Sequence, residues 1–288
     1  MKQQKRYLRE LFRQRGIFAE RKLGQCFLVD GNLQDYIVRQ AALTKDDLVL
    51  EVGAGTGQLT SLLAERAGRV LSVEIDAALY DLAREHCVDA DNLLLVNADV
   101  LAGKNRINPA VLDPLADLAR SMGGYHLVAN LPYYVALPVM LNLCEEDVPW
   151  VKMLVTVQKE FATKLAAGPG QAGYGAATLF FQCWARARIL RTLPPQVFWP
   201  RPAVDSAILE AHPRRKLLPG IEYRQFKEFV RHLFSQRRKK LANSVASYGK
   251  ARDLDGSRAL AAAGVDGDLR PETLSLETFM EIFLQLTA

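Results

Sequence analysis

The residues Asn130-Leu131-Pro132-Tyr133 place an amide, a proline and an aromatic ring directly after an apolar run, 126–129, that predicts a strand. An adenine amino group is a poor nucleophile because its lone pair is delocalised into the ring. The Asn130 carboxamide oxygen and the carbonyl before Pro132 could accept its hydrogens and free the lone pair. Pro132 fixes the backbone, and Tyr133 offers a flat face for stacking a base. The tetrapeptide fits methylation of an exocyclic amine, although it could also form an ordinary strand-to-helix turn.

A glycine-rich segment follows another predicted strand. Residues 47–52 form a buried apolar run that leads into Gly53-Ala54-Gly55-Thr56-Gly57, and a helix pattern begins at Gln58. A pyrophosphate-binding loop requires glycine at the first, third and sixth places, and Gln58 occupies the sixth. The alternating glycines together with Glu51 therefore suit a ligand without phosphate.

Carboxylates end the next two predicted strands. The strand at 69–75 ends in Glu74-Ile75-Asp76, where the carboxylates could accept both hydroxyls of a ribose. The strand at 92–96 is followed by Asn97-Ala98-Asp99, where Asp99 could accept the amino group of an adenine ring. With the glycine loop, these residues describe a site for S-adenosylmethionine.

Seven motifs in this order resemble the ribosomal RNA adenine N6,N6-dimethyltransferases: Gly24-Gln25-Cys26-Phe27-Leu28, 51–57, 73–76, 98–99, 130–133, 158–160 and 198–207. The resemblance spans nearly the whole chain. It is strongest for small-subunit enzymes of the kasugamycin-resistance type, which dimethylate two adjacent adenines in the 3'-terminal hairpin loop of 16S rRNA. It implies an α/β class I S-adenosylmethionine-dependent methyltransferase fold, Rossmann-like with a mostly parallel seven-stranded sheet, and a small helical C-terminal domain.

The resemblance also implies roles for individual residues. Phe198 would stack on the target adenine opposite Tyr133, although a hydrophobic plug is the alternative for this ring. The expected catalytic residues are Asn130, Leu131, Pro132, Tyr133 and Phe198. The expected cofactor-binding residues are Gln25, Cys26, Leu28, Glu51, Gly53, Gly55, Gly57, Glu74, Ile75, Asp99 and Asn130.

Cys26 departs from the family pattern, which has Asn at this place. A thiol is a weaker donor and acceptor than an amide, so we expect that cofactor contact to be weak or replaced. A small, partly buried cysteine is the favoured interpretation over a reactive thiol.

Composition bounds the remaining possibilities. The chain has 288 residues, of which 49% are hydrophobic and 24% charged, enough for one large and one smaller domain. The longest apolar runs fall short of eighteen residues, which argues against a membrane span. The four cysteines and four histidines are scattered, so we expect no metal site or disulfide framework and a reducing, cytoplasmic location. A monomer is also expected.

Positive charge is concentrated near the N-terminus. Residues 1–22 contain eight Lys or Arg against two Glu, whereas the whole chain has a net charge of +5. A transit peptide would be similarly basic, but this arm lacks Ser, and RNA contact is favoured. A second basic run, Arg237-Arg238-Lys239-Lys240, interrupts an apolar pattern at 226–245 that we interpret as one helical stripe. It is either a solvated face or a phosphate-binding surface, and phosphate binding is favoured.

Alternating strand and helix patterns over about 45–212 predict a parallel sheet with crossovers and an antiparallel insertion at its edge. A helix is expected at 109–120, and helices at 222–286 broken at Gly249, Gly256, Gly264 and Pro271. The expected domains are a basic arm at 1–22, the methyltransferase domain at 23–215 and a helical domain at 216–288. The expected strands are 47–52, 69–75, 92–96, 125–130, 150–157, 177–191 and 205–211.

The predicted function is dimethylation of 16S rRNA in the immature small ribosomal subunit. A large-subunit rRNA dimethylase of the macrolide-resistance type shares every motif; the Leu in the tetrapeptide and the helical tail favour the small-subunit type. A DNA adenine methyltransferase usually has another tetrapeptide and a base-reading domain. A non-catalytic ribosome-assembly or transcription factor on this fold is disfavoured by the intact Gly53, Glu74, Asp99 and Asn130.

Overall fold

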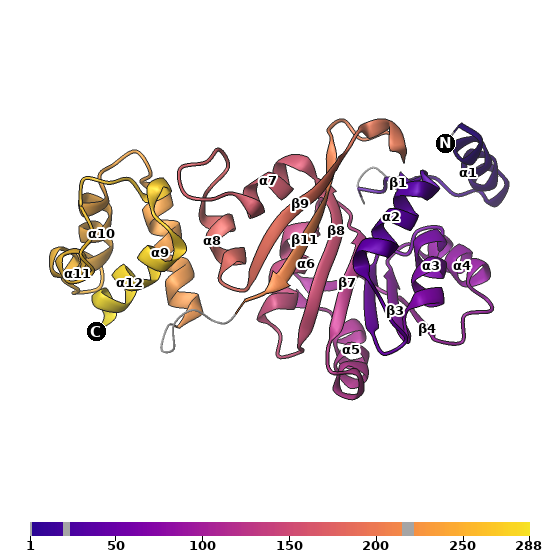
Figure 1. Ribbon diagram of the computed structural model, residues 1–288, viewed down its shortest axis with the longest axis horizontal. Helices are drawn as coiled ribbons and strands as arrows, with labels where there is room; N and C mark the ends of the chain where they lie inside the picture. The colour runs from indigo at the N-terminus through magenta and orange to yellow at the C-terminus, as the bar shows by residue number, and fades with distance from the viewer. Residues whose placement is uncertain (1, 20–23, 215–221) are drawn as a thin grey trace. The chain divides into compact units, whose positions relative to one another are not determined.

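The computed structural model describes residues 2–19, 24–214 and 222–288, and the chain divides into two compact units (Figure 1). Unit 1 comprises Met1–Ala162 and Arg188–Pro213, and unit 2 comprises Thr163–Ala187 and Arg214–Ala288. The stretch 163–187 thus groups with the C-terminal helices, whereas the sequence pattern assigns it to the methyltransferase domain.

A mostly parallel sheet forms the framework of unit 1. Its strand order in the described part of the chain is β4-β3-β2-β7-β8-β11-β9. The first five strands in that order are parallel, and β11 is antiparallel to β8, with Ser206 opposite Gln158. The predicted sheet with an antiparallel insertion is confirmed. The strands are β2 (Leu48–Val52), β3 (Arg69–Glu74), β4 (Leu93–Asn97), β7 (Tyr125–Asn130), β8 (Trp150–Gln158), β9 (Ala185–Leu193) and β11 (Ser206–Pro213).

The strand predicted at 177–191 is wrong in its first part. Residues Ala176–Gln182 form helix α8, and β9 begins only at Ala185. The Gly175 amide donates to Thr178 Oγ1 at 3.1 Å where this helix begins. Leu179–Phe181 are buried. A short run of consecutive apolar residues has no periodicity that distinguishes helix from strand.

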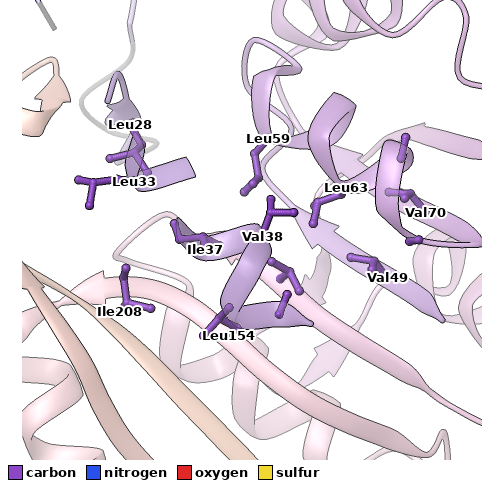
Figure 2. Close-up of a cluster of buried hydrophobic side chains, with 14 of the residues drawn as sticks. Leu28, Leu33, Ile37, Val38, Val49, Leu59, Leu63, Val70, Leu154 and Ile208 are labelled. Atoms are coloured by element: carbon purple, nitrogen blue, oxygen red, sulfur yellow. The ribbon is translucent and has the colours of Figure 1, made fainter. Parts of the chain in front are cut away.

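Two helices, α2 (Gly31–Ala41) and α3 (Gln58–Arg66), pack on one face of the sheet (Figure 2). Their apolar residues meet one buried residue from each of several neighbouring strands. Every second residue of a strand points to the same face of the sheet, so the strands can present these residues together. Full burial of one such leucine or valine contributes roughly 1.5–3 kcal/mol, so this layer holds the strands firmly. The contacts join Leu33, Ile37, Val38, Leu59 and Leu63 to Val49, Val70, Leu154 and Ile208.

Side-chain caps start two of the helices that follow strands, α4 (Ala77–His86) and α5 (Pro109–Met122). Asp76 Oδ1 accepts hydrogen bonds from the amides of Ala78 and Leu79 at 2.9 and 3.2 Å, and Asn108 Oδ1 accepts from Ala110 N at 3.0 Å. Such caps satisfy amides that have no partner within the helix. The predicted helix at 109–120 is confirmed, and a short hairpin of β5 (Leu101–Gly103) and β6 (Arg106–Ile107) precedes it. Two further helices follow strands, α6 (Ala136–Glu145) and α7 (Lys159–Ala166), and α6 begins without a side-chain cap.

Most of the described part of the basic arm, residues 2–19, is helix α1 (Lys2–Arg15). Its apolar side chains Leu8 and Phe12 are buried with Leu79 and Leu82 of α4. Arg15 pairs with Glu85 of α4 at 2.6 Å. The basic residues Arg6, Arg9 and Arg13 are exposed on the same helix, and the expected basic residues Arg21 and Lys22 lie outside the described residues.

Unit 2 contains helices packed around phenylalanine side chains. Phe226 and Phe229 are fully buried and contact Phe283 with ring centroids 5.6 and 5.5 Å apart. The single predicted stripe at 226–245 is wrong, because α9 ends at Ser235 and residues 236–240 form the turn before the next helix. The elements are α8, α9 (Tyr223–Ser235), α10 (Leu241–Lys250), α11 (Gly256–Ala262), η3 (Pro271–Thr273) and α12 (Leu276–Thr287).

The predicted helix breaks correspond to real boundaries at three of the four positions. Gly256 begins α11, Gly264 has a positive φ of 64° just after it, and Pro271 begins η3. Gly249 instead lies within α10. Across the described ranges, none of the helices combines the length and apolarity needed to span a bilayer.

Candidate active site

A cavity lies at the carboxyl ends of β2, β3, β4 and β7. Ligand sites of open α/β sheets are formed at this edge because the loops after parallel strands converge there. The cavity is lined by Gly24, Gln25, Cys26, Phe27, Val52, Gly53, Gly55, Val73, Glu74, Ile75, Leu79, Ala98, Asp99, Val100 and Asn130–Val135. It therefore brings together most of the residues that the sequence predicts for the site.

The glycine loop has a backbone conformation that residues with side chains rarely adopt. Gly53, Gly55 and Gly57 have φ values of 87°, 59° and 80°. A Cβ on Gly55 would lie 3.2 Å from the Phe27 ring, and one on Gly57 would lie 3.1 Å from Ala83 Cα. Gly53 and Gly55 line the cavity, whereas Gly57 packs against α4 and begins α3. The loop thus needs glycine for its backbone conformation and for close approach.

Glu51 lies behind the glycine loop rather than in the main cavity. Its side chain is 1% exposed, and its Oε2 accepts hydrogen bonds from Thr60 Oγ1 and Ser72 Oγ, both at 2.6 Å. Burial raises the pKa of this carboxyl to about 7, against the two hydroxyl donors. Its Oε1 is buried and lacks a hydrogen-bond partner among the described residues. Glu51 lines a smaller cavity that shares Gly53, Gly55 and Asn130 with the main one.

Glu74 presents a carboxylate at the end of β3. Its Oε2 accepts from the Gly55 amide at 2.8 Å and its Oε1 accepts from the Asp76 amide at 3.0 Å. Burial raises the pKa of Glu74, and these two amides oppose that rise. Ile75 is 40% exposed at the cavity. Asp76 instead caps α4 and accepts from Gln25 Nε2 at 3.2 Å, so it supports the lining rather than forming it.

Asp99 lines the cavity from the loop after β4. Its Oδ1 accepts from the Leu101 amide at 2.9 Å, which fixes the side chain. Asn108 Nδ2 donates to the backbone carbonyl of Asp99 at 2.9 Å. Both contacts hold the loop while the second carboxylate oxygen remains available to a ligand.

Asn130 is held by the backbone of the segment that contains Cys26. Its Nδ2 donates to the Cys26 carbonyl at 2.8 Å. An amide that uses its nitrogen in this way offers its oxygen as the acceptor. The Cys26 side chain packs against the apolar core, and burial raises the pKa of its thiol. A raised thiol pKa disfavours the nucleophilic thiolate.

The remaining residues of the tetrapeptide are fixed by neighbouring strands. Leu131 is buried and its amide donates to Thr156 of β8 at 3.2 Å. The Tyr133 hydroxyl and Ser206 Oγ of β11 are 2.6 Å apart. Burial raises the pKa of Tyr133 to about 12, so the ring is neutral at ordinary pH. Ser206 is therefore a positioning residue that sequence analysis did not identify, and only its place in the last motif hinted at it.

The structure does not place Phe198 opposite Tyr133. Phe198 is fully buried in β10 (Phe198–Trp199), which pairs with β1 (Phe27–Leu28). Its ring belongs to the core cluster with Leu28, Leu193 and Val197. The prediction of a ring facing the target base is wrong for this arrangement, because pairing with β1 turns the side chain into the core. Leu28, another predicted site residue, lines the smaller cavity beside Glu51 and not the main cavity.

Sequence analysis missed several lining residues, among them the aromatic residues Phe27 and Tyr134. Phe27 lies against Gly55, and Tyr134, 51% exposed, lies at the cavity close to Gly24. Phe27 lies within the motif 24–28, and Tyr134 directly follows the motif 130–133. Their involvement depends on how the two segments meet, which motif order does not specify.

The parallel sheet, the glycine loop and the cavity at the carboxyl edge define a class I methyltransferase fold. Among solved structures, a dimethyladenosine transferase from Plasmodium falciparum superposes with a TM-score of 0.74 at 20% identity, covering 90% of this chain and 96% of that chain. The 23S rRNA methyltransferase ErmE superposes with a TM-score of 0.67 at 26% identity, covering 91% and 100%.

The sequence comparison specifies the family. The family model described as ribosomal RNA adenine dimethylase matches residues 18–288. A ribosomal RNA small subunit methyltransferase A from Pelotomaculum thermopropionicum is 39% identical, covering 96% of this chain and 94% of the relative. One of the same name from Geobacillus thermodenitrificans is 36% identical, covering 95% and 93%. The chain belongs to the ribosomal RNA adenine dimethylase family and is a methyltransferase.

The raised pKa of Glu51 predicts a pH-dependent stability. Between about pH 4.5 and about pH 7 the folded state binds the Glu51 proton more tightly than the unfolded state. The free energy of unfolding should therefore fall as pH rises through this window, by up to about 3 kcal/mol, and then level off. The amide that Glu51→Gln introduces cannot titrate. Urea unfolding at pH 4.5 to 8 should therefore show this fall in the free energy of unfolding in the wild type and not in the variant. Parallel curves for the two proteins would contradict the assignment.

Proposed function

We propose that this enzyme transfers methyl groups from S-adenosylmethionine to the N6 amino groups of two adjacent adenines in the 3'-terminal hairpin loop of 16S rRNA. The observation that carries the proposal is the Asn130 carboxamide, whose nitrogen is committed to Cys26 O and whose oxygen is thereby the acceptor beside Tyr133. The small-subunit names of relatives at 36–39% identity support the choice of RNA.

The residues at the strand ends fit this cofactor. Glu74 is a carboxylate that retains acceptor capacity for ribose hydroxyls, and Ile75 and Val100 are apolar residues suited to an adenine ring. Gly53 and Gly55 form a cradle that a side chain would fill. The buried Glu51 Oε1 lacks a partner among the described residues, and a cationic amino group would supply one. The bound cofactor supplies an electrophilic methyl group on a sulfonium.

The chain's own groups act on the target amine. Asn130 Oδ1 and the Leu131 carbonyl accept its two hydrogens, which directs the lone pair towards the methyl group. Tyr133 stacks on the base, and its hydrogen bond to Ser206 fixes the ring. Because the Tyr133 pKa is raised to about 12, this hydroxyl holds position and does not take up a proton. Catalysis therefore depends on positioning rather than on a strong base.

A base in a single-stranded loop is the least costly to turn out of its stack, which suits a hairpin-loop target. Exposed Arg6, Arg9 and Arg13 on α1 line a basic hollow with Lys5 and Glu10. We propose that this hollow contacts RNA phosphates. The proposal includes the immature small subunit as the substrate particle, a cytoplasmic location and a monomeric enzyme.

Labelled methyl transfer tests the substrate. Immature small subunits, large subunits and DNA would each be incubated with the enzyme and tritiated S-adenosylmethionine, and the label would be mapped by nuclease digestion. The proposal expects label in two adjacent adenines of 16S rRNA. Label mainly in large-subunit RNA would favour the alternative represented by ErmE, and label in DNA or none would reject the RNA function.

Asn130→Ala tests the chemistry. Removal of an acceptor that acts in the transition state should slow single-turnover transfer by on the order of a hundredfold or more. Cofactor affinity, measured by calorimetry, should change little, since the glycine loop and Glu74 remain. Leu118→Ala, in the C-terminal half of α5 and outside the residues that line the cavity, is a control for handling and assay. Transfer by Asn130→Ala within about threefold of the wild type would reduce Asn130 to a turn residue.

Salt dependence tests the basic surface of α1. Each phosphate contact to single-stranded RNA contributes about 0.7 to the slope of log affinity against log salt, so Arg6→Gln with Arg9→Gln should flatten the slope by about 1.4. The matched control is Arg120→Gln, an exposed arginine near the start of β7 and thus at the opposite edge of the sheet. An unchanged slope in the double variant would place the RNA surface elsewhere.

The same measurement applies to unit 2. Arg237, Arg238 and Lys239 are exposed, whereas Lys240 pairs with Asp268 at 2.9 Å. Neutralising the first three tests whether this turn is a phosphate contact or a solvated face.

A further inference from the structure

We propose that helix α1, through Phe12, is a positioning element for the cofactor site and for Asn130, in addition to any contact its charges make with RNA. This inference rests on the proposed function of the cavity. It assigns a catalytic purpose to the apolar side of a helix whose basic side had suggested only RNA binding. All of the residues involved belong to unit 1.

The first link joins Phe12 to strands β1 and β10. Phe12 is 2% exposed. Its ring lies edge-on to Phe27, with centroids 5.3 Å apart at 74°, and to Trp199, with centroids 5.1 Å apart at 81°. Phe27 and Trp199 are themselves stacked at 6.3 Å and are direct partners in the β1–β10 pair. Phe12 thus closes a three-ring cluster over this strand pair.

The second link joins the same strand to the site. The Phe27 ring lies 3.2 Å from the position of a Cβ on Gly55, so it rests on the glycine loop, and it lines the cavity. The residue before it, Cys26, supplies the carbonyl that accepts from Asn130 Nδ2 at 2.8 Å. A shift of Phe27 would therefore move both the cofactor cradle and the group that orients Asn130.

The third link anchors α1 itself. Leu8 and Phe12 pack on Leu79 and Leu82 of α4, and Arg15 pairs with Glu85 at 2.6 Å. Lys5 Nζ also donates to the carbonyl of Gln196, just before β10. The helix is fixed at both ends to elements around the cavity, and β1 has only two residues, which pair with β10. A two-residue strand needs such outside support to keep its place.

Phe12→Ala tests the inference. Loss of two edge-to-face contacts should weaken binding of S-adenosylhomocysteine, measured by calorimetry without RNA, by roughly tenfold. Displacement of Cys26 should also slow single-turnover transfer at saturating RNA by about tenfold or more. Phe12→Leu retains apolar volume and should recover part of both losses. Tyr7→Ala, which removes a 62% exposed ring from the same helix, should leave both within about twofold of the wild type.

The outcomes separate this inference from its alternatives. A folded Phe12→Ala protein that binds and transfers within about twofold of the wild type would overturn it, since α1 would then be only a cover. If Phe12→Ala does not fold, the same twofold criterion for binding and transfer applies to Phe12→Leu, after thermal unfolding has shown that this variant is folded. Arg6→Gln with Arg9→Gln should change the salt slope without weakening S-adenosylhomocysteine binding. The binding of S-adenosylhomocysteine is measured without RNA, so an error in the proposed RNA substrate would not change the effect of Phe12→Ala on that binding. If the wild type does not bind S-adenosylhomocysteine, the proposed cofactor is rejected.

Discussion

The hydrogen bond from Asn130 Nδ2 to the Cys26 carbonyl is the contact on which the proposed chemistry depends. It joins the end of the central strand β7 to a segment more than a hundred residues earlier in the chain. A carboxamide can accept with one atom only, so a partner for its nitrogen decides which atom faces the amine. The sheet fixes Asn130 through β7 and β8, and the remaining question is what fixes Cys26. The pairing of β1 with β10 and the rings behind it provide that support.

The sheet could be predicted because its strands are apolar runs that end in polar residues, and parallel connection follows from the helices between them. The prediction of a strand at 177–191 failed because the consecutive residues Thr178–Phe181 of α8 are all buried, so the run carries no helical period. The stripe at 226–245 failed for a different reason. Its apolar spacing continues across the turn at 236–240, although the Gln236 carbonyl accepts from the Lys239 amide there and breaks the helix. Periodicity detects which residues face a core, not whether one helix or two present them.

Site residues could be predicted from the sequence wherever a single motif contains both the end of a strand and the functional group. Gly53, Glu74, Asp99 and Asn130 all line the cavity for this reason. The burial of Glu51 under the glycine loop and of Phe198 in the core did not follow from the sequence, because both depend on contacts between separate segments. Glu51 lies under the loop with Thr60 and Ser72, and Phe198 turns into the core when β10 pairs with β1. No spacing rule within either motif contains that information.

The cysteine at position 26 is compatible with catalysis because the contact it makes with Asn130 comes from its backbone. A carbonyl is present whatever the side chain, so replacement of the usual Asn preserves the orientation of Asn130 as long as the strand keeps its place. The thiol instead joins the apolar cluster beside Leu28, where an amide would need polar partners. Cys26 thus contributes apolar packing at a position where the family resemblance implies a polar contact towards the cofactor. The packing of Phe12, Phe27 and Trp199 is important here because the backbone carbonyl orients Asn130 only while β1 stays where those rings hold it.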